Sequence, residues 1–126
     1  MKILTAAILV VVGMINFLPI LGITSAATLE RLYGIAVTGP DVEILLRHRA
    51  VLFGMLGALL IVSAFQPKLQ KLAVVAGAVS LSSFILIALL VGDYGDAVRN
   101  VVIIDVVALI ALLIVPVLHR STRNPR

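Results

Sequence analysis

Two groups of ionisable residues in this 126-residue sequence stand inside or beside long apolar runs, where a charge is costly. Asp105 lies within the last apolar run, and Arg47-His48-Arg49 stand together at the start of the second. A carboxylate in a membrane-spanning helix costs about 2.5 to 3.5 kcal/mol on insertion scales, so it tends to face the bundle interior and to be paired. Because Arg47 and Arg49 lie at a similar depth, we expect one of them to pair with Asp105.

This arrangement has two interpretations. One is a structural ion pair that holds helices in register, and the other is a ligand or proton site that uses the same charges. His48 is a candidate proton carrier, although a lone histidine at a membrane boundary is more often a polar anchor. Glu43 precedes Arg47 by one helical turn, a spacing that favours a solvated salt bridge. A remaining arginine could bind a lipid phosphate or carboxylate, or extend its charge to the interface.

Polar residues on other segments extend this candidate cluster. Asn16 is expected roughly level with Asp105, where an amide usually bonds across helices. Pro19 loosens the same helix and frees a carbonyl nearby. The candidate ligand-binding or structural cluster is therefore Asn16, Arg47, His48, Arg49 and Asp105, with Tyr33, Glu43 and Arg99 as secondary members.

Common catalytic and metal-binding signatures are missing from the sequence. It has no Gly-rich phosphate loop, no G-x-S-x-G and no H-E-x-x-H motif. It also has no cysteine, and no second histidine stands at ligand spacing from His48. We therefore predict no catalytic residue, no metal ligand and no cofactor, and we favour a role other than catalysis.

The elements that must position these side chains are long apolar helices. The chain is 62% hydrophobic and only 13% charged, a composition that requires lipid as solvent. Its apolar runs do not alternate and are too long for membrane strands of about 10 residues. We predict one all-α domain over 1–126, a four-transmembrane-helix bundle with spans at about 3–23, 44–65, 72–91 and 101–118.

The connection between the first two spans carries a further helix signal. Ser25 can cap a short helix over 26–33 that Gly34 ends, and the apolar side of this helix predicts an interfacial position. Pro40 then suits the first position of the next helix, and residues 66–71 are expected to form a tight polar turn. An alternative stays open, in which the first span is a signal peptide cleaved after residues 24–26.

The charges predict how the bundle is oriented. Lys and Arg cluster near span ends on one side, so the positive-inside rule places both termini in the cytoplasm. That side carries Lys2, Lys68, Lys71, Arg120, Arg123 and Arg126. All acidic residues fall on the outer side or in the outer half of the membrane: Glu30, Asp41, Glu43, Asp93, Asp96 and Asp105. Because the basic residues are scattered at span ends, the net charge of +4 does not indicate nucleic-acid binding.

Small residues repeat at four-residue spacing on two of the spans and predict close helix packing. They are Ala50, Gly54 and Ala58 on the second span, and Ala73 and Gly77 on the third. The pattern leaves open whether these faces pack within one chain or form a homo-oligomer.

Three stretches carry a family resemblance: LYGI at 32–35, ILLRHRAVLFG at 44–54 and DVV at 105–107. With them the chain resembles, over nearly its whole length, a family of short bacterial four-helix membrane proteins whose members often carry the name phosphopantetheine adenylyltransferase. That name belongs to a soluble α/β nucleotidyltransferase with a Gly-His phosphate-binding motif. The present sequence has no Gly-His pair and no α/β pattern, so the label has no physical support here. A looser similarity, in size and layout alone, is to DoxX-like membrane proteins.

Three functional hypotheses follow from the sequence. The first is a non-enzymatic bundle whose polar cluster in the outer half of the membrane binds a lipid, a quinone or a partner membrane protein. The second is a small membrane enzyme that acts on an amphipathic substrate at the outer interface, with His48 and Asp105 as proton carriers. The third is a small transporter that acts as a dimer.

Overall fold

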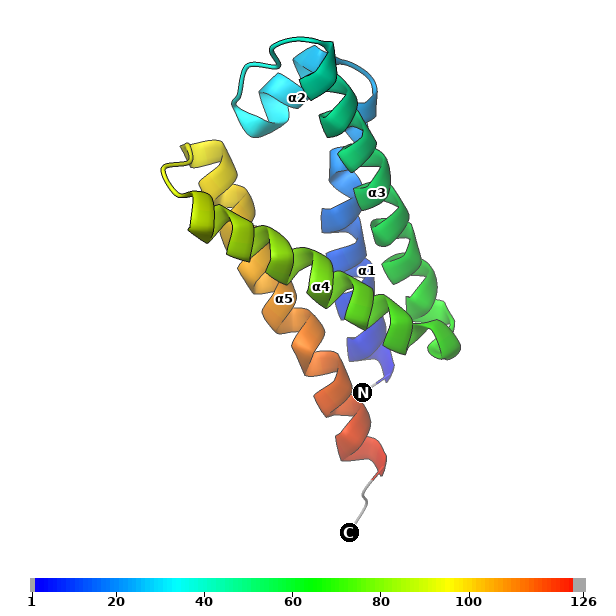
Figure 1. Ribbon diagram of the computed structural model, residues 1–126. Helices are drawn as coiled ribbons and strands as arrows, with labels where there is room; N and C mark the ends of the chain where they lie inside the picture. The colour runs from blue at the N-terminus through cyan, green and yellow to red at the C-terminus, as the bar shows by residue number, and fades with distance from the viewer. Residues whose placement is uncertain (1, 124–126) are drawn as a thin grey trace.

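The computed structural model describes residues 2–123, and within that range all regular structure is helical. The elements are α1 (Lys2–Phe17), the 3₁₀ helix η1 (Leu18–Ile23), α2 (Ala26–Tyr33), α3 (Pro40–Phe65), α4 (Pro67–Val91) and α5 (Asp96–Arg123) (Figure 1). Four segments are long and apolar enough to cross a membrane: α1 with η1, α3, α4 and α5. The prediction of an all-α chain with four such helices is confirmed. Arg126, which entered the charge argument, lies outside the described residues.

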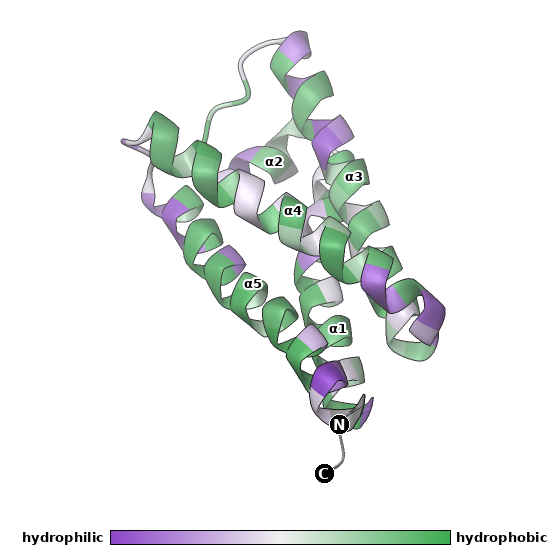
Figure 2. Ribbon diagram, turned by 60° about the horizontal axis from the view of Figure 1, so that its bottom comes forward, coloured by the Kyte–Doolittle hydropathy of each residue, from purple (hydrophilic) through white to green (hydrophobic). Residues whose placement is uncertain are grey.

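The four long helices form a ring in which each contacts two others. Going round the ring, α1 packs on α3, α3 on α4, α4 on α5, and α5 on α1. The pairs α1 with α4 and α3 with α5 are therefore diagonal. The start of α1, the α3–α4 junction and the last turns of α5 lie at one end, the terminal end, whereas α2 and the α4–α5 loop lie at the other, the α2 end (Figure 1). Hydrophilic segments gather toward these two ends (Figure 2).

Two glycines set the closest approach between α1 and α3. A Cβ atom on Gly57 would lie 2.6 Å from the carbonyl oxygen of Gly13 and 2.7 Å from the backbone nitrogen of Phe17. The helix backbones therefore touch directly, without side chains between them. Large apolar side chains fill the rest of the interior, among them Leu9, Val12, Leu60, Leu81 and Leu112.

The small residues singled out in the sequence fall into two groups. Four of them, Ala50, Gly54, Ala73 and Gly77, are buried between helices of the same chain. Ala58 is exposed, because the close-packing face of α3 continues through Gly57. Packing against a second copy through any of these residues stays a prediction.

The helices are longer than the charge-free runs, and the connections are correspondingly shorter. A six-residue turn over 66–71 was the wrong expectation, since Gln66 alone separates α3 from α4. Pro67 explains the difference, because its fixed φ and missing N–H suit the first position of a helix. At the first span, α1 ends at Phe17 and continues as η1, in keeping with the loosening expected from Pro19.

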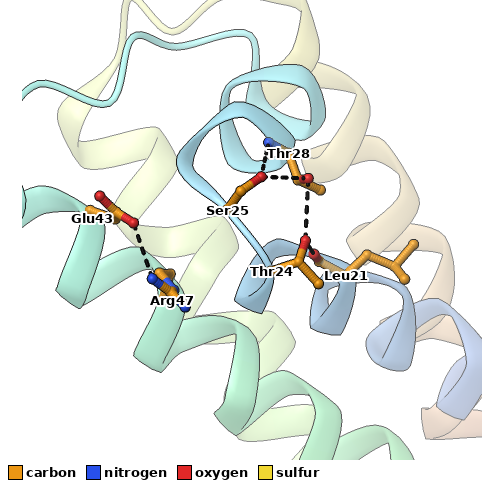
Figure 3. Close-up of polar contacts among 6 residues, drawn as sticks. All are labelled: Leu21, Thr24, Ser25, Thr28, Glu43 and Arg47. Carbon is orange, nitrogen blue, oxygen red and sulfur yellow. Dashed lines mark hydrogen bonds and ion pairs between the residues drawn. The ribbon is translucent and has the colours of Figure 1, made fainter.

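Helix α2 is a short capped helix that covers one end of the bundle. Ser25 accepts a hydrogen bond from the backbone N–H of Thr28 at 3.2 Å, and its hydroxyl lies 3.0 Å from the Thr28 hydroxyl (Figure 3). Gly34 ends the helix with φ of 62°, the left-handed conformation that glycine adopts without cost. Leu29 is completely buried and anchors α2 beneath η1, close to Gly22. The bounds predicted for this helix, 26–33, are confirmed.

We expect Ser25→Ala to destabilise α2 locally by about 1 kcal/mol, because the Thr28 N–H would lose its cap. Hydrogen exchange of the α2 amides in detergent micelles measures this effect. Exchange should accelerate about fivefold in α2 and stay unchanged in α4. Equal acceleration in both helices would contradict a local role for the cap.

Candidate functional site

A cavity of about 230 Å³ opens at the α2 end of the bundle, in the space enclosed by α1, η1, α2, α3 and α5. We call it the α2-end cavity. Its walls are mostly apolar, and Arg49 and Asp105 are the charged side chains among its lining residues. The lining consists of Ile15, Asn16, Leu18, Pro19, Leu32, Tyr33, Arg49, Phe53, Val101, Ile104 and Asp105.

Arg49 is held by aromatic rings from three helices. Its guanidinium carbon lies 5.6 Å from the ring centre of Tyr33, 5.0 Å from that of Phe53 and 4.8 Å from that of Phe84. Within about 6 Å the face of a ring attracts a cation, and the attraction grows where water is excluded. These rings belong to α2, α3 and α4, so Arg49 ties the short helix to two of the long ones.

Asp105 lines the cavity from α5, the helix diagonally opposite the α3 helix that carries Arg49. It is only 7% exposed and lies on the buried face of α5 with Ala108 and Leu112, so it faces the bundle interior as the sequence predicted. Asp105 and Arg49 each lie nine residues from the start of their helices.

No direct ion pair joins these two charges. Over the range 2–123 the ion pairs are Arg47 with Glu43 and Arg99 with Asp96, and Asp105 forms neither an ion pair nor a hydrogen bond. The ion pair that we expected between Asp105 and either Arg47 or Arg49 is therefore not formed. Both side chains line the α2-end cavity, and the helices that carry them, α3 and α5, are diagonal in the ring.

Asn16 and Tyr33 supply the other polar groups of the cavity wall. The Asn16 side-chain amide donates to the carbonyl of Val12 at 2.9 Å, on its own helix, so the expected bond to a neighbouring helix is not formed. Burial raises the pKa of the half-buried Tyr33 phenol, an effect that Arg49 opposes and Asp105 reinforces. The hydroxyl consequently stays protonated at neutral pH and can donate a hydrogen bond.

The remaining candidates of the polar cluster lie outside the cavity. Arg47 contacts Glu43 at 3.1 Å on the exposed side of α3, the helical salt bridge that its spacing predicted (Figure 3). Arg99 contacts Asp96 at 3.2 Å within the exposed first turn of α5. His48 is exposed and absent from the cavity lining, because it points about 100° away from Arg49 around the helix.

Sequence reasoning missed the two phenylalanines that hold Arg49. Phe53 follows Arg49 by one helical turn, so the spacing of the pair could have revealed it. Phe84 comes from α4, and nothing in its sequence context connects it to an arginine on α3.

Arg49 also lies at the edge of a second cavity, of about 410 Å³, between α3 and α4. Ser80, Ser83 and Phe84 help to line it.

Comparisons of the chain with models of protein families, with curated proteins and with solved structures find no match.

Proposed function

We propose that this chain is a multi-pass protein of the bacterial inner membrane that binds a neutral amphipathic molecule, an isoprenoid quinone or a lipid of similar polarity, in the α2-end cavity. The observation that carries this proposal is that Arg49 and Asp105 line one cavity without forming an ion pair. Two opposite charges in apolar walls and without a direct contact can hold a polar group that accepts from one and donates to the other.

The chemistry of the cavity favours a neutral ligand over an anionic one. Arg49 and the Tyr33 hydroxyl can donate to a carbonyl, whereas the Asp105 carboxylate can accept from a hydroxyl. A phosphate or fatty-acid carboxylate would gain from Arg49 but be repelled by Asp105 in surroundings of low dielectric constant. A quinol ring meets both requirements at once, because each of its hydroxyls can donate to the carboxylate and accept from Arg49 or Tyr33. The oxidised quinone only accepts, so it would bond with Arg49 and Tyr33 but not with Asp105.

Size and access support a ring with an attached apolar tail. At about 30 Å³ per water, a cavity of about 230 Å³ has room for several water molecules, and therefore for a polar ring. Leu18, Leu32 and Ile104 line the cavity and are also exposed, so it opens sideways between η1, α2 and α5. A tail that leaves by this opening would enter hydrocarbon.

The proposed orientation places both termini in the cytoplasm and α2 in the outer interface. Support comes from the distribution of charge, since every acidic residue within 2–123 lies at the α2 end or in the half of the bundle next to it. On α2 itself Leu29 is buried, whereas Glu30 and Arg31 are exposed, as expected for an interfacial helix. We also propose that the chain belongs to the family of short bacterial four-helix membrane proteins that its sequence resembles.

The test uses decylubiquinol, kept reduced, as a probe and native mass spectrometry of the detergent-solubilised protein. Arg49→Gln and Asp105→Asn should each weaken binding about tenfold, because each removes a hydrogen bond to a charged group. The matched control is His48→Gln, which changes an exposed neighbour of Arg49 and should bind as the wild type does. Equal affinity in all four proteins would refute the proposal.

The enzyme hypothesis receives no comparable support. It requires His48 and Asp105 to face one substrate, but His48 is exposed outside the α2-end cavity. Binding is therefore the function that the geometry favours.

A further inference from the structure

We propose a second ligand site at the terminal end of the bundle, where the phosphate of an anionic membrane lipid binds beside Lys2. A cavity of about 300 Å³ lies there, formed by the first turns of α1, the α3–α4 junction and the last turns of α5. We call it the terminal-end cavity. Its lining residues are Lys2, Thr5, Ala64, Pro67, Gln70, Leu118 and His119.

Two buried polar side chains point to a ligand in this cavity. Thr5 is 3% exposed and Gln70 is 9% exposed, and within the described part of the chain neither side chain has a hydrogen-bond partner. None of their polar atoms is fully enclosed, so the remaining access is to the cavity that they line. The Thr5 hydroxyl and the Gln70 amide are hydrogen-bond donors, so a phosphate bound in this cavity could accept from both.

The positively charged side chains at the terminal end favour an anionic ligand. Lys2 lines the cavity, and Lys68, Lys71 and Arg120 lie on the neighbouring turns of α4 and α5. Every acidic side chain of the chain is at the α2 end or in the adjacent half of the bundle. Among the described residues, an anion at the terminal end therefore meets cationic side chains without a competing acidic side chain, the reverse of the situation beside Asp105.

Apolar residues in and beside the cavity indicate that the phosphate belongs to a lipid. Ala64 and Leu118 form part of the cavity wall. The adjacent side chains Ile3 and Phe65 are 86% and 75% exposed, and both are apolar. A phosphate bound beside Lys2 would place its acyl chains along these exposed residues. The inference rests on the membrane location proposed above but not on the quinone site, which lies at the opposite end of the bundle.

The experiment titrates detergent-solubilised protein with phosphatidylglycerol and, in parallel, with phosphatidylcholine of the same acyl chains, using native mass spectrometry. Wild type should prefer the anionic lipid. Lys2→Gln should weaken phosphatidylglycerol binding about fivefold, equivalent to about 1 kcal/mol for one lysine near a membrane surface. Gln70→Leu should weaken it as well, because the amide that would donate to the phosphate is removed.

Lys71→Gln is the matched control, since it removes one exposed positive charge from the same end but outside the cavity. It should leave the preference for phosphatidylglycerol unchanged. An equal loss in Lys2→Gln and Lys71→Gln would overturn the site in favour of general surface charge, and so would unchanged binding in both Lys2→Gln and Gln70→Leu. Stabilisation by sodium phosphate alone, abolished by Lys2→Gln, would support the site and show that a free phosphate suffices. Decylubiquinol binding should be normal in all these variants, which separates this test from that of the α2-end cavity.

Discussion

Arg49→Gln is expected to lower the free energy of unfolding by about 2–4 kcal/mol, the largest effect of any single change proposed here. The guanidinium contacts the rings of Tyr33, Phe53 and Phe84, so its loss removes three cation–π contacts at once. The same change leaves Asp105 in an apolar cavity with no cation among the lining residues. Both consequences act against the folded state.

Unfolding in mixed micelles with increasing SDS measures this free energy. Arg47→Gln serves as the control because Arg47 forms an exposed salt bridge on the same helix, worth about 0–1 kcal/mol. The double variant Arg49→Gln/Asp105→Asn should recover part of the loss, since no buried charge then remains in the cavity. A loss for Arg49→Gln no larger than that for Arg47→Gln would show that the aromatic contacts contribute little.

Gly57→Ala is expected to destabilise the bundle by about 1–3 kcal/mol through steric overlap. The new Cβ would lie 2.6 Å from the Gly13 carbonyl oxygen and 2.7 Å from the Phe17 nitrogen, and backbone atoms cannot move aside as a side chain can. Alanine favours a helix over glycine by up to about 1 kcal/mol, which offsets only part of this cost. The helices α1 and α3 must therefore separate.

Two other glycines give a graded comparison for the same measurement. Gly77→Ala should cost less, because its Cβ would meet the flexible end of Leu112 at 2.8 Å. Gly95→Ala should be nearly neutral, since nothing lies within 4 Å of the position of its Cβ. Thermal unfolding in detergent should rank the variants Gly57, Gly77, Gly95 from most to least damaging, and a Gly95→Ala as harmful as Gly57→Ala would contradict the steric explanation.

Much of the fold was predictable because a single physical requirement governs it. Backbone groups in hydrocarbon must bond within their own segment, so long apolar runs become helices whatever their detailed composition. The short helix α2 was also predictable, because the Ser25 cap and the Gly34 terminator act through local hydrogen bonds. The helix ends next to Pro67 differ from the prediction because the proline starts α4 directly after Gln66, although the following residues are polar.

The site was only partly predictable, since its geometry depends on which helices are diagonal. The depth of Asp105 and the inward direction of its side chain follow from spacing along one helix. The missing contact with Arg49 follows instead from the ring order of α1, α3, α4 and α5, which no local pattern encodes. The approach of Phe84 to Arg49 is likewise a contact between separate helices. Sequence alone therefore found the charges of the α2-end cavity but not the distance between them.

The single-residue connection at Gln66 has a consequence for biosynthesis. Because one residue joins α3 to α4, the connection is too short for one helix to span the bilayer during translation while the other stays in the aqueous phase. In the orientation proposed above, the two helices enter together as a hairpin, and its bend, which carries the hydrated side chains of Lys68 and Lys71, stays on the cytoplasmic side. Arg49 and Phe84 thus arrive in the membrane in the same step, and the aromatic enclosure of that cation forms as the hairpin inserts.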